Sequence, residues 1–364
     1  MRQYKKSTIK EVAAEAGVST TTVSIFVSGR ENVCSAETAE RIRSAITALN
    51  YTPNSLAAGL HRRTTSTIGV SIMSLADMSL ADMSLPEDPR SSSFLYIARL
   101  ERGIALQADE EGLALLHYPR AIRFGEGIEP FLDGRVDGLL FHSLDNSRPE
   151  WLAAAGMPTV MLARSRNLPK DCGTACADET QTAALALSHL WDLGHRRIAH
   201  FAGPVGVFPA LGEVEDDTAV GRLEGYAAWL KDRGAFDPVL IEYTGSWAVP
   251  NARAALERWR RLPQPPTAIF CANDAQALDV LSAAQAMNRR VPQDISLVGV
   301  DDSIPARRSQ PPLTSVHVPL EDIGREALRS LLRLMAGAKL EECRVTSPVT
   351  QIVVRATTRP PAIT

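Results

Sequence analysis

The chain has 364 residues, a length that predicts two or three domains at about 150 residues each. Hydrophobic residues make up 45% and charged residues 22% of the chain, so the composition excludes a generally disordered protein. The formal net charge of −3 gives, for the chain as a whole, no sign of a nucleic-acid partner.

The sequence carries none of the usual marks of membrane, secreted or metal-binding proteins. No apolar run reaches the roughly 18–20 residues of a membrane span, and the basic start of the chain lacks the apolar core of a secretory signal. The five cysteines are odd in number and scattered, which indicates a reduced, cytoplasmic compartment. Cys172 and Cys176 have no histidine nearby and poor spacing for zinc. We therefore expect neither a metal nor a cofactor.

Charge is distributed unevenly along the chain. Residues 1–66 contain nine basic and five acidic residues, a net charge of +4, which leaves −7 for the remaining 298 residues. A basic head on an acidic body is the asymmetry expected when only the head meets a polyanion. Solvated charge runs are common, so this pattern needs support from the motifs.

The basic head begins with a short predicted helix. Thr8 and Glu11 have capping-box spacing, in which each side chain accepts from the other residue's backbone N–H. Gly17 then supplies the positive φ that ends the helix. Its apolar face consists of Ile9, Val12, Ala13 and Ala16.

Two further helices are expected in the head. The second runs from Thr20 to about Ser28, after Ser19 as its cap and before Gly29, and the third runs from Ser35 to just before Tyr51. Two short helices joined by a tight glycine-containing turn form a helix-turn-helix unit. A small helical bundle without a nucleic-acid role has the same spacing, so spacing alone leaves both interpretations open.

Two motifs are more specific than the spacing. Residues 8–19, TIKEVAAEAGVS, followed by Thr22, Val23 and Ser24, resemble the headpiece of the lactose-repressor (LacI/GalR) family. Residues 50–60, NYTPNSLAAGL, resemble that family's hinge. The two motifs occur in the family's order and at its separation, so the resemblance implies a DNA-binding headpiece over 1–52 and a hinge helix and linker over 53–65.

The resemblance also implies which residues contact DNA. The second helix of such a headpiece enters the major groove, and the hinge of this family inserts a leucine into the minor groove. The implied DNA-binding residues are Ser19, Thr20, Thr21, Ser24, Ile25, Asn54, Ala57 and Leu60. Ile25 departs from the family, which usually has an arginine there, and it offers only apolar contact, for example to a thymine methyl group.

The rest of the chain has the pattern of an α/β protein. Continuous apolar strands alternate with amphipathic helices, which predicts parallel sheets covered on both faces. The strands are expected at Thr67–Met73, Leu113–Tyr118, Val136–Phe141, Thr159–Leu162, Arg197–Ala202, Ala268–Cys271 and Ile295–Val300. Helices are expected at Thr180–Leu193, Gly221–Arg233 and Ala275–Met287, among others. This stretch is too long for one sheet, which predicts two lobes.

Motifs of the same family continue to the end of the body, including residues 193–199, LGHRRIA, and 298–302, VGVDD. The resemblance implies a two-lobed sensor similar to periplasmic sugar-binding proteins, over residues 66–364, whose chain crosses between the lobes three times. We expect one lobe at about 66–176 and 315–340, and the other at about 177–308 and 345–358. The expected fold is an all-α headpiece followed by this α/β sensor.

Six residues are candidates for binding an effector between the lobes. An aromatic ring stacks on a sugar or base face, an aspartate accepts hydrogens from adjacent hydroxyls, and arginine or asparagine donates to ring or hydroxyl oxygens. The candidates are Tyr96, Arg164, Arg222, Trp247, Asn273 and Asp301, of which Arg222, Trp247, Asn273 and Asp301 match family positions. An ordinary core tryptophan and a structural aspartate at a strand end are the alternative interpretations.

The sensor departs from the family at two places. Ala163 stands where the family usually has an aspartate, which weakens the case for a typical hexose-like binding mode. Residues 74–85 contain the sequence Ser-Leu-Ala-Asp-Met twice in tandem, and we expect a surface loop there, near the mouth of the interlobe cleft.

These observations favour a cytoplasmic transcriptional regulator, with repression as the expected action, that binds a palindromic operator as a homodimer and responds to a small carbohydrate-like effector. The alternative is a solute-binding receptor without DNA function, which the headpiece motifs oppose. An enzyme on an α/β fold is a third possibility, opposed by the missing nucleophile, phosphate-loop and metal motifs. The sequence leaves the identity of the effector and the operator open.

Overall fold

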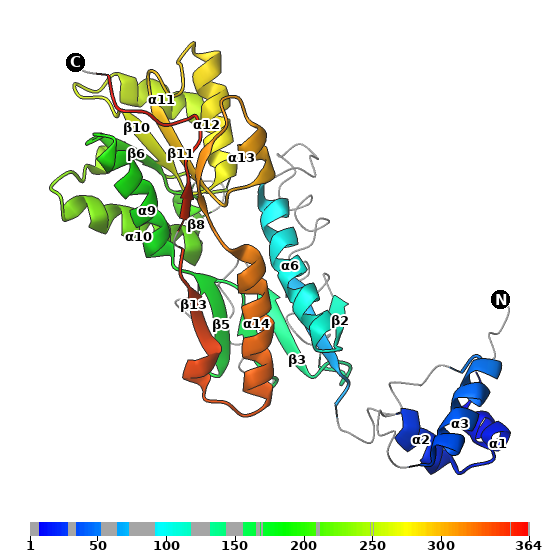
Figure 1. Cartoon of the computed structure of the whole chain (residues 1–364). Helices are drawn as coiled ribbons and strands as arrows, with labels where there is room; N and C mark the ends of the chain where they lie inside the picture. Colours follow the sequence, from blue (N-terminus) through cyan, green and yellow to red (C-terminus); the bar gives the residue numbers. More distant parts are fainter. Residues whose placement is uncertain are drawn as a thin grey trace. The chain divides into compact units, whose positions relative to one another are not determined.

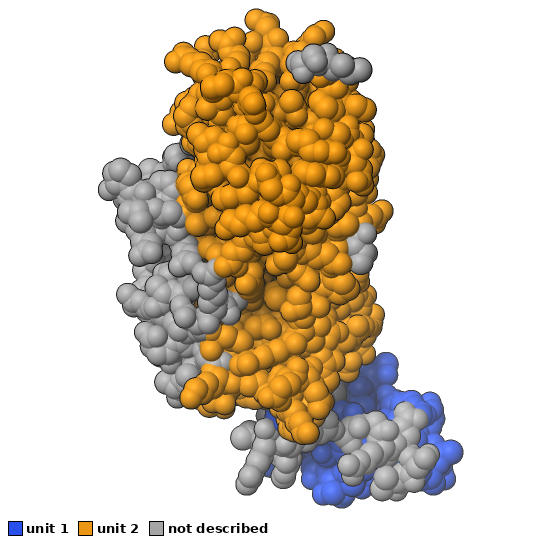
Figure 2. All heavy atoms as spheres, turned by 90° about the vertical axis from the view of Figure 1, so that its left-hand side faces the viewer, with its two compact units in different colours: residues 1–65 blue, residues 66–364 orange. Residues whose placement is uncertain are grey.

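The structure is a computed structural model that describes residues 7–27, 34–51, 64–72, 92–117, 132–142, 156–164, 168, 170–208, 212–247, 249, 251–349 and 351–362. The chain divides into two compact units, residues 1–65 and residues 66–364 (Figure 2). The boundary falls where the sequence analysis places the start of the sensor.

The first unit contains the three predicted helices, α1 (Ile9–Ala16), α2 (Thr20–Val27) and α3 (Ala36–Ala48). The capping box of α1 is confirmed, because the Thr8 side chain accepts from the Glu11 backbone N–H and the Glu11 side chain accepts from the Thr8 N–H. Gly17 ends α1 with a φ of 65°. The helices enclose a small core of Val12, Ala13, Ala16, Val23, Phe26, Ala39, Ile42 and Ala45.

The second unit is built on two six-stranded sheets (Figure 1). The first sheet has the order β13-β5-β4-β3-β1-β2, and all its strand pairs are parallel. Its strands are β1 (Thr67–Ile72), β2 (Ala114–His117), β3 (Gly138–His142), β4 (Thr159–Met161), β5 (Cys172–Ala177) and β13 (Arg344–Ser347). The helices α6 (Ser92–Glu110) and α14 (Leu320–Met335) lie side by side on this lobe (Figure 1).

The second sheet has the order β14-β12-β11-β10-β6-β9, and only its β12–β14 pair is antiparallel. Its strands are β6 (Ile198–Phe201), β9 (Ile241–Glu242), β10 (Ala268–Cys271), β11 (Ser296–Val300), β12 (Thr314–His317) and β14 (Gln351–Val353). Its helices are α9 (Glu179–Asp192), α10 (Asp217–Lys231), α11 (Ala252–Arg260), α12 (Asp274–Ala286) and α13 (Ile304–Arg308). A hairpin of β7 (Val205–Phe208) and β8 (Gly212–Glu215) connects β6 to α10, and the short helices η3 (Pro238–Leu240) and η4 (Leu340–Cys343) complete the described elements.

Both faces of the second sheet are buried, as predicted for parallel sheets. In β10, Phe270 belongs to the core that includes residues of α9 and α10, whereas its neighbours Ile269 and Cys271 belong to the core that includes α11 and α12. This alternation follows from the two-residue period of a strand. Most of the predicted strand ends agree with the structure to within two residues. The helix α10 begins four residues earlier than predicted, because the Asp216 side chain caps it.

Two strands belong to the lobe opposite to the one that the sequence predicts. The sequence analysis predicts residues 315–317 in the first lobe, but β12 pairs with β11 and β14 of the second sheet. It predicts residues 345–347 in the second lobe, but β13 pairs with β5 of the first sheet. Both predictions are wrong, because short strands reveal little in their own sequence about the distant strand with which they pair.

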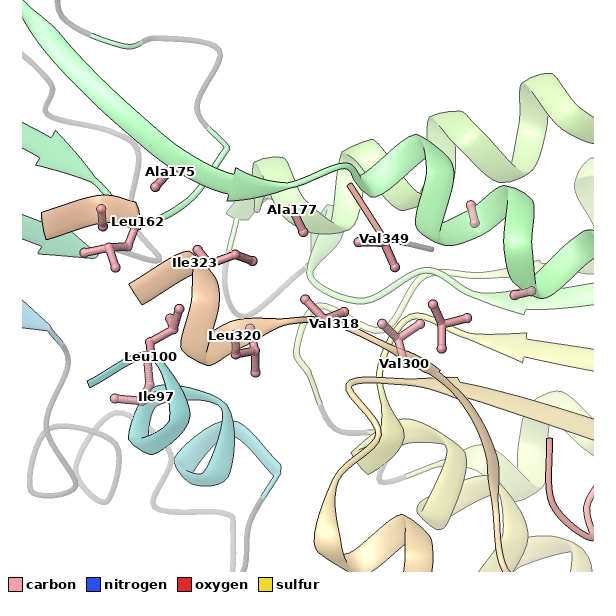
Figure 3. Packing of buried hydrophobic residues seen from close by; sticks show 14 of the residues in the cluster. Ile97, Leu100, Leu162, Ala175, Ala177, Val300, Val318, Leu320, Ile323 and Val349 are labelled. Atoms are coloured by element: carbon pink, nitrogen blue, oxygen red, sulfur yellow. The ribbon is translucent and has the colours of Figure 1, made fainter. Parts of the chain in front are cut away.

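The chain passes between the lobes three times, after β5, after β12 and after β13. One residue near each crossing, Ala177, Val318 and Val349, belongs to a single apolar cluster that also contains Val300 of the second sheet and Leu320 of α14 (Figure 3). The crossings are therefore packed into the core. No helix in the described part of the chain is long and apolar enough to cross a membrane.

Two glycines allow α6 and α14 to approach each other closely. A Cβ atom added to Gly324 would lie 2.2 Å from the backbone oxygen of Leu100, and one added to Gly103 would lie 2.0 Å from that of Glu321. Real Cβ atoms do not approach a backbone oxygen so closely, so any side chain at either position would force the helices apart.

We predict that Gly324→Ala lowers the free energy of unfolding by about 1–3 kcal/mol, the usual cost of overpacking a core. In an isolated helix the same substitution would raise stability by about 1 kcal/mol, so the sign of the change reports the helix contact. Urea unfolding measures it, with Arg329→Ala on the exposed side of α14 as the control. An unchanged or raised stability in Gly324→Ala would contradict the close contact.

Candidate functional site: a helix-turn-helix surface and a buried polar cluster

The outward side of α2 carries hydroxyl groups. The predicted headpiece residues Ser19, Thr20, Thr21 and Ser24 are exposed, and Ile25 is partly buried. Val23 and Phe26 are buried in the core and thereby set the rotation of the helix. α2 contains no acidic or basic residue. Its surface therefore offers hydrogen bonds and apolar contact, but no charge.

Ser19 begins α2. Its Oγ accepts a hydrogen bond from the Thr22 backbone N–H at 3.0 Å, and it lies 2.8 Å from the Thr22 Oγ1. This arrangement places the partially positive N-terminus of the helix next to the exposed hydroxyls, where a phosphate oxygen binds favourably. The predicted hinge contacts Asn54, Ala57 and Leu60 lie outside the described residues.

In the described part of the headpiece, exposed positive charge lies on the helices next to α2. Lys10 on α1 and Arg41 and Arg43 on α3 are exposed. The Arg43 guanidinium carbon lies 5.5 Å from the centre of the Phe26 ring, and its Nη1 lies 3.1 Å from the Glu40 Oε2. Among these described residues, the hydroxyl groups on α2 and the cations that attract phosphates therefore lie on different helices.

Arg222 on α10 lies at the centre of a second candidate site, within the sensor. Its side chain is 2% exposed, and its Nε donates to the Glu179 Oε2 at 2.5 Å. Its Nη1 donates to the Ala272 carbonyl oxygen, and its guanidinium carbon lies 5.7 Å from the centre of the Trp247 ring. Burial opposes the charge, but Glu179 and Asp301 raise the pKa of Arg222 above its ordinary value. Arg222 is therefore a buried, permanent cation.

Asn273 and Trp247 are held together beside Arg222. Asn273 follows β10 and caps α12, because its side-chain oxygen accepts from the Gln276 backbone N–H at 2.8 Å. Its Nδ2 donates to the Trp247 carbonyl oxygen at 3.2 Å. A Cβ on Gly203 would lie 3.3 Å from the Trp247 ring, so the end of β6 also packs against it. Asn273 thus positions Trp247 as well as the start of α12.

Asp301 directly follows β11 and has a strained backbone, with a φ of 107°. Its carbonyl oxygen accepts from the Arg99 Nη1 at 2.9 Å, whereas its buried Oδ1 has no hydrogen-bond partner among the described residues. Burial raises the pKa of Asp301 to about 8, Arg222 opposes this shift, and Asp274 and Glu179 add to it. A buried acceptor without a partner is unfavourable unless a ligand or water donates to it.

Tyr96 and Arg164 reach this cluster from the first lobe. The Tyr96 ring on α6 lies 5.9 Å from the His142 ring, and burial together with Glu179 raises the pKa of its hydroxyl. Arg164 follows β4 and packs on Gly221, where an added Cβ would lie 2.3 Å from its Nη1. Its Nη2 lies 3.4 Å from the Glu224 Oε2. The structure therefore brings all six predicted sensor residues into one neighbourhood.

Three members of the cluster were not predicted. Glu179 is the first residue of α9 and is 5% exposed. Asp216 caps α10 by accepting from the Thr218 and Ala219 N–H groups, and burial raises its pKa to about 6. His142 ends β3, and burial lowers its pKa to about 4. Their positions at strand ends or helix starts could have marked them as candidates, because open α/β sheets bind ligands there.

Comparisons with known proteins agree with this architecture. Residues 8–54 match the model of the lacI family of bacterial regulatory proteins, and residues 187–358 match that of the periplasmic binding protein-like domain. The ribose operon repressor of Escherichia coli K12 is 31% identical over 344 residues, covering 93% of this chain and 96% of that protein. The transcriptional regulator CelR of Thermobifida fusca is 32% identical over 351 residues, covering 95% and 96%.

Solved structures lead to the same conclusion. The lac repressor dimer bound to operator and the anti-inducer ONPF superposes with a TM-score of 0.78 at 27% identity, covering 98% of this chain and all of that one. A CelR–cellobiose complex gives a TM-score of 0.66 at 29% identity, covering 97% of this chain and all of that one. The chain belongs to the lacI family of bacterial transcriptional regulators, with an N-terminal helix-turn-helix headpiece and a two-lobed periplasmic-binding-protein-like sensor.

Proposed function

We propose that the chain represses transcription by binding a palindromic operator as a homodimer, in the cytoplasm and without catalytic activity, under the control of a small polar effector. The observation that carries the proposal is the presence, in one chain, of the exposed hydroxyl surface of α2 and the buried polar cluster around Arg222. A receptor without DNA function has no use for the first of these features.

Thr20, Thr21 and Ser24 are proposed to contact base edges and phosphates in the major groove, with Ile25 adding apolar contact. Ser19 would bind phosphate at the helix N-terminus. The proposed contacts in the minor groove are Asn54, Ala57 and Leu60, and the leucine is the wedge that bends the duplex. The half-sites of a palindromic operator match the two-fold symmetry of a homodimer.

The effector is proposed to lie among six side chains, those of Arg222, Asp301, Trp247, Asn273, Tyr96 and Arg164. The unpartnered Asp301 Oδ1 is the proposed acceptor for a ligand hydroxyl, and the Trp247 ring is the proposed stacking surface. The names of two relatives, a ribose operon repressor and a regulator solved with cellobiose, support a carbohydrate-like effector.

The proposed effector acts by favouring one arrangement of the lobes. Tyr96 and Arg164 come from the first lobe and the other four residues come from the second, so a ligand that contacts both sets binds one lobe arrangement more tightly. The ligand can change DNA affinity only by this difference in binding between the two arrangements.

Removing residues 1–60 tests the division of labour. The full chain is expected to shift DNA from upstream of its own gene in an electrophoretic assay, and the truncated chain is expected to lose this binding entirely. Because residues 66–364 form a separate unit, both proteins should show the same thermal stabilisation by an effector found in a screen of sugars, polyols and nucleosides. A full chain that binds neither this DNA nor any site genome-wide would contradict the regulator, and loss of effector binding on truncation would contradict the modular arrangement.

The raised pKa of Asp301 predicts a pH-dependent stability. Native Asp301 keeps its proton up to about pH 8, whereas the unfolded chain loses it near the ordinary value of 3.8. The native state therefore binds more protons between these values, and the stability that Asp301 contributes below pH 4 is lost as the pH rises towards 8. Asp301→Asn should flatten the pH dependence of unfolding in this window by up to about 1.4 kcal/mol per pH unit.

Thermal and urea unfolding between pH 4 and 8 measure the difference. Asp294→Asn is the control, because Arg290 lowers the pKa of Asp294 to about 2 and any difference in slope should then appear only below pH 4. Parallel curves for the wild type and Asp301→Asn across the window would show that Asp301 is ionised in the free protein.

A further inference from the structure

We propose that Glu179 occupies the anion-binding face of Arg222, so that the effector site selects a ligand without negative charge. This inference rests on the proposed effector site and adds the chemical class of the ligand. It also assigns Glu179 as a residue that determines specificity.

The contacts of Arg222 with Glu179 and Ala272 occupy N–H groups that would otherwise bind an anion. A guanidinium binds carboxylate or phosphate best through two parallel N–H groups. The Nε donates to Glu179 at 2.5 Å, and the Nη1 is engaged by the Ala272 carbonyl oxygen. The two side chains are only 2% and 4% exposed, so water does not screen the interaction. Glu179 thus stands where a ligand carboxylate or phosphate would bind.

Glu179 is held in place from two sides. It is the first residue of α9, directly after Asp178, whose side chain accepts from the Gln181 N–H at 2.9 Å and whose own N–H donates to the Ser347 carbonyl oxygen at 3.0 Å. On α10, Gly221 lacks the Cβ that would lie 2.9 Å from the Glu179 Cβ. These contacts fix the backbone from which the Glu179 carboxylate reaches Arg222, at the first crossing between the lobes.

The negative charge of Glu179 also disfavours a second anion at Arg222. Burial raises the pKa values of the nearby Asp301 and Asp216 carboxyls, so that Asp301 is protonated at neutral pH and offers a ligand hydrogen bonds instead of a negative charge. An anion that bound here would compete with the Glu179 carboxylate for Arg222, and the two negative charges would repel each other in a poorly screened interior. A neutral polyol meets no such repulsion and can still accept hydrogen bonds from the remaining N–H groups of Arg222 and donate to Asp301.

Chemical rescue tests the occupancy of Arg222. Glu179→Ala should leave a buried, unpaired arginine and lower the thermal midpoint, and sodium formate should raise that midpoint in a saturable way by replacing the missing carboxylate. The wild type should show no such response beyond that seen with sodium chloride at equal ionic strength. Glu257→Ala is the control, because it removes a carboxylate paired with Arg253 on the exposed side of α11.

If Glu179→Ala folds only with formate, the appearance of a cooperative transition is the supporting result. Glu179→Gln, which retains an oxygen acceptor for the Arg222 Nε, serves as the second variant and should show a weaker need for formate. A formate response no larger than that of Glu257→Ala would overturn the assignment of Arg222 as an anion receptor held by Glu179.

Calorimetry on the full wild-type chain tests the selectivity with matched probes, ribose against ribose 5-phosphate and cellobiose against cellobionate. The neutral member of each pair should have a dissociation constant at least about tenfold lower than that of the anion. Tighter binding of an anion would overturn this inference, but the regulator would stand as long as the chain binds DNA. Failure of DNA binding, with neutral sugars still preferred, would contradict the proposed function and leave this inference standing.

Discussion

A single buried guanidinium organises the sensor. A charge removed from water is tolerated only when its partners are in place, and Arg222 takes these partners from elements that are far apart in the sequence. Glu179 begins α9, the Ala272 carbonyl follows β10, and the Trp247 ring belongs to the segment after β9. The charge can therefore be buried only when α9 is packed against α10 and the loops at the strand ends are in place.

The same region carries the connections between the lobes. Glu179 lies at the first crossing, and Asp178 bonds to Ser347 at the third. Near the second crossing, Arg99 of α6 donates to the carbonyl oxygens of Asp301 and Val318 at 2.9 and 3.4 Å. Ala177, Val318 and Val349 are packed in one apolar cluster, so contacting side chains join the three crossings (Figure 3). The proposed effector response requires that a change at the polar site is transmitted through such packed contacts.

Local patterns in the sequence were enough for most elements. The capping box and Gly17 defined α1, and the apolar run of β10 was predicted at the residues where it lies. The sheet membership of β12 and β13 was not predictable in this way, because it depends on pairing with distant strands. For the site, residue types and family motifs indicated Arg222 and Asp301. Glu179 was missed, since its burial and its partner arise only when α9 packs against α10.

The uncharged face of α2 separates two components of DNA recognition. Affinity that comes from releasing counterions grows with the number of phosphates neutralised by lysine or arginine, and it falls steeply with salt. In the described headpiece those cations lie on α1 and α3, whereas α2 carries only hydroxyl and apolar side chains. Ionic strength should thus set how tightly the protein holds DNA in general, while the preference for its operator over other sequences, as far as α2 supplies it, stays nearly constant as salt changes.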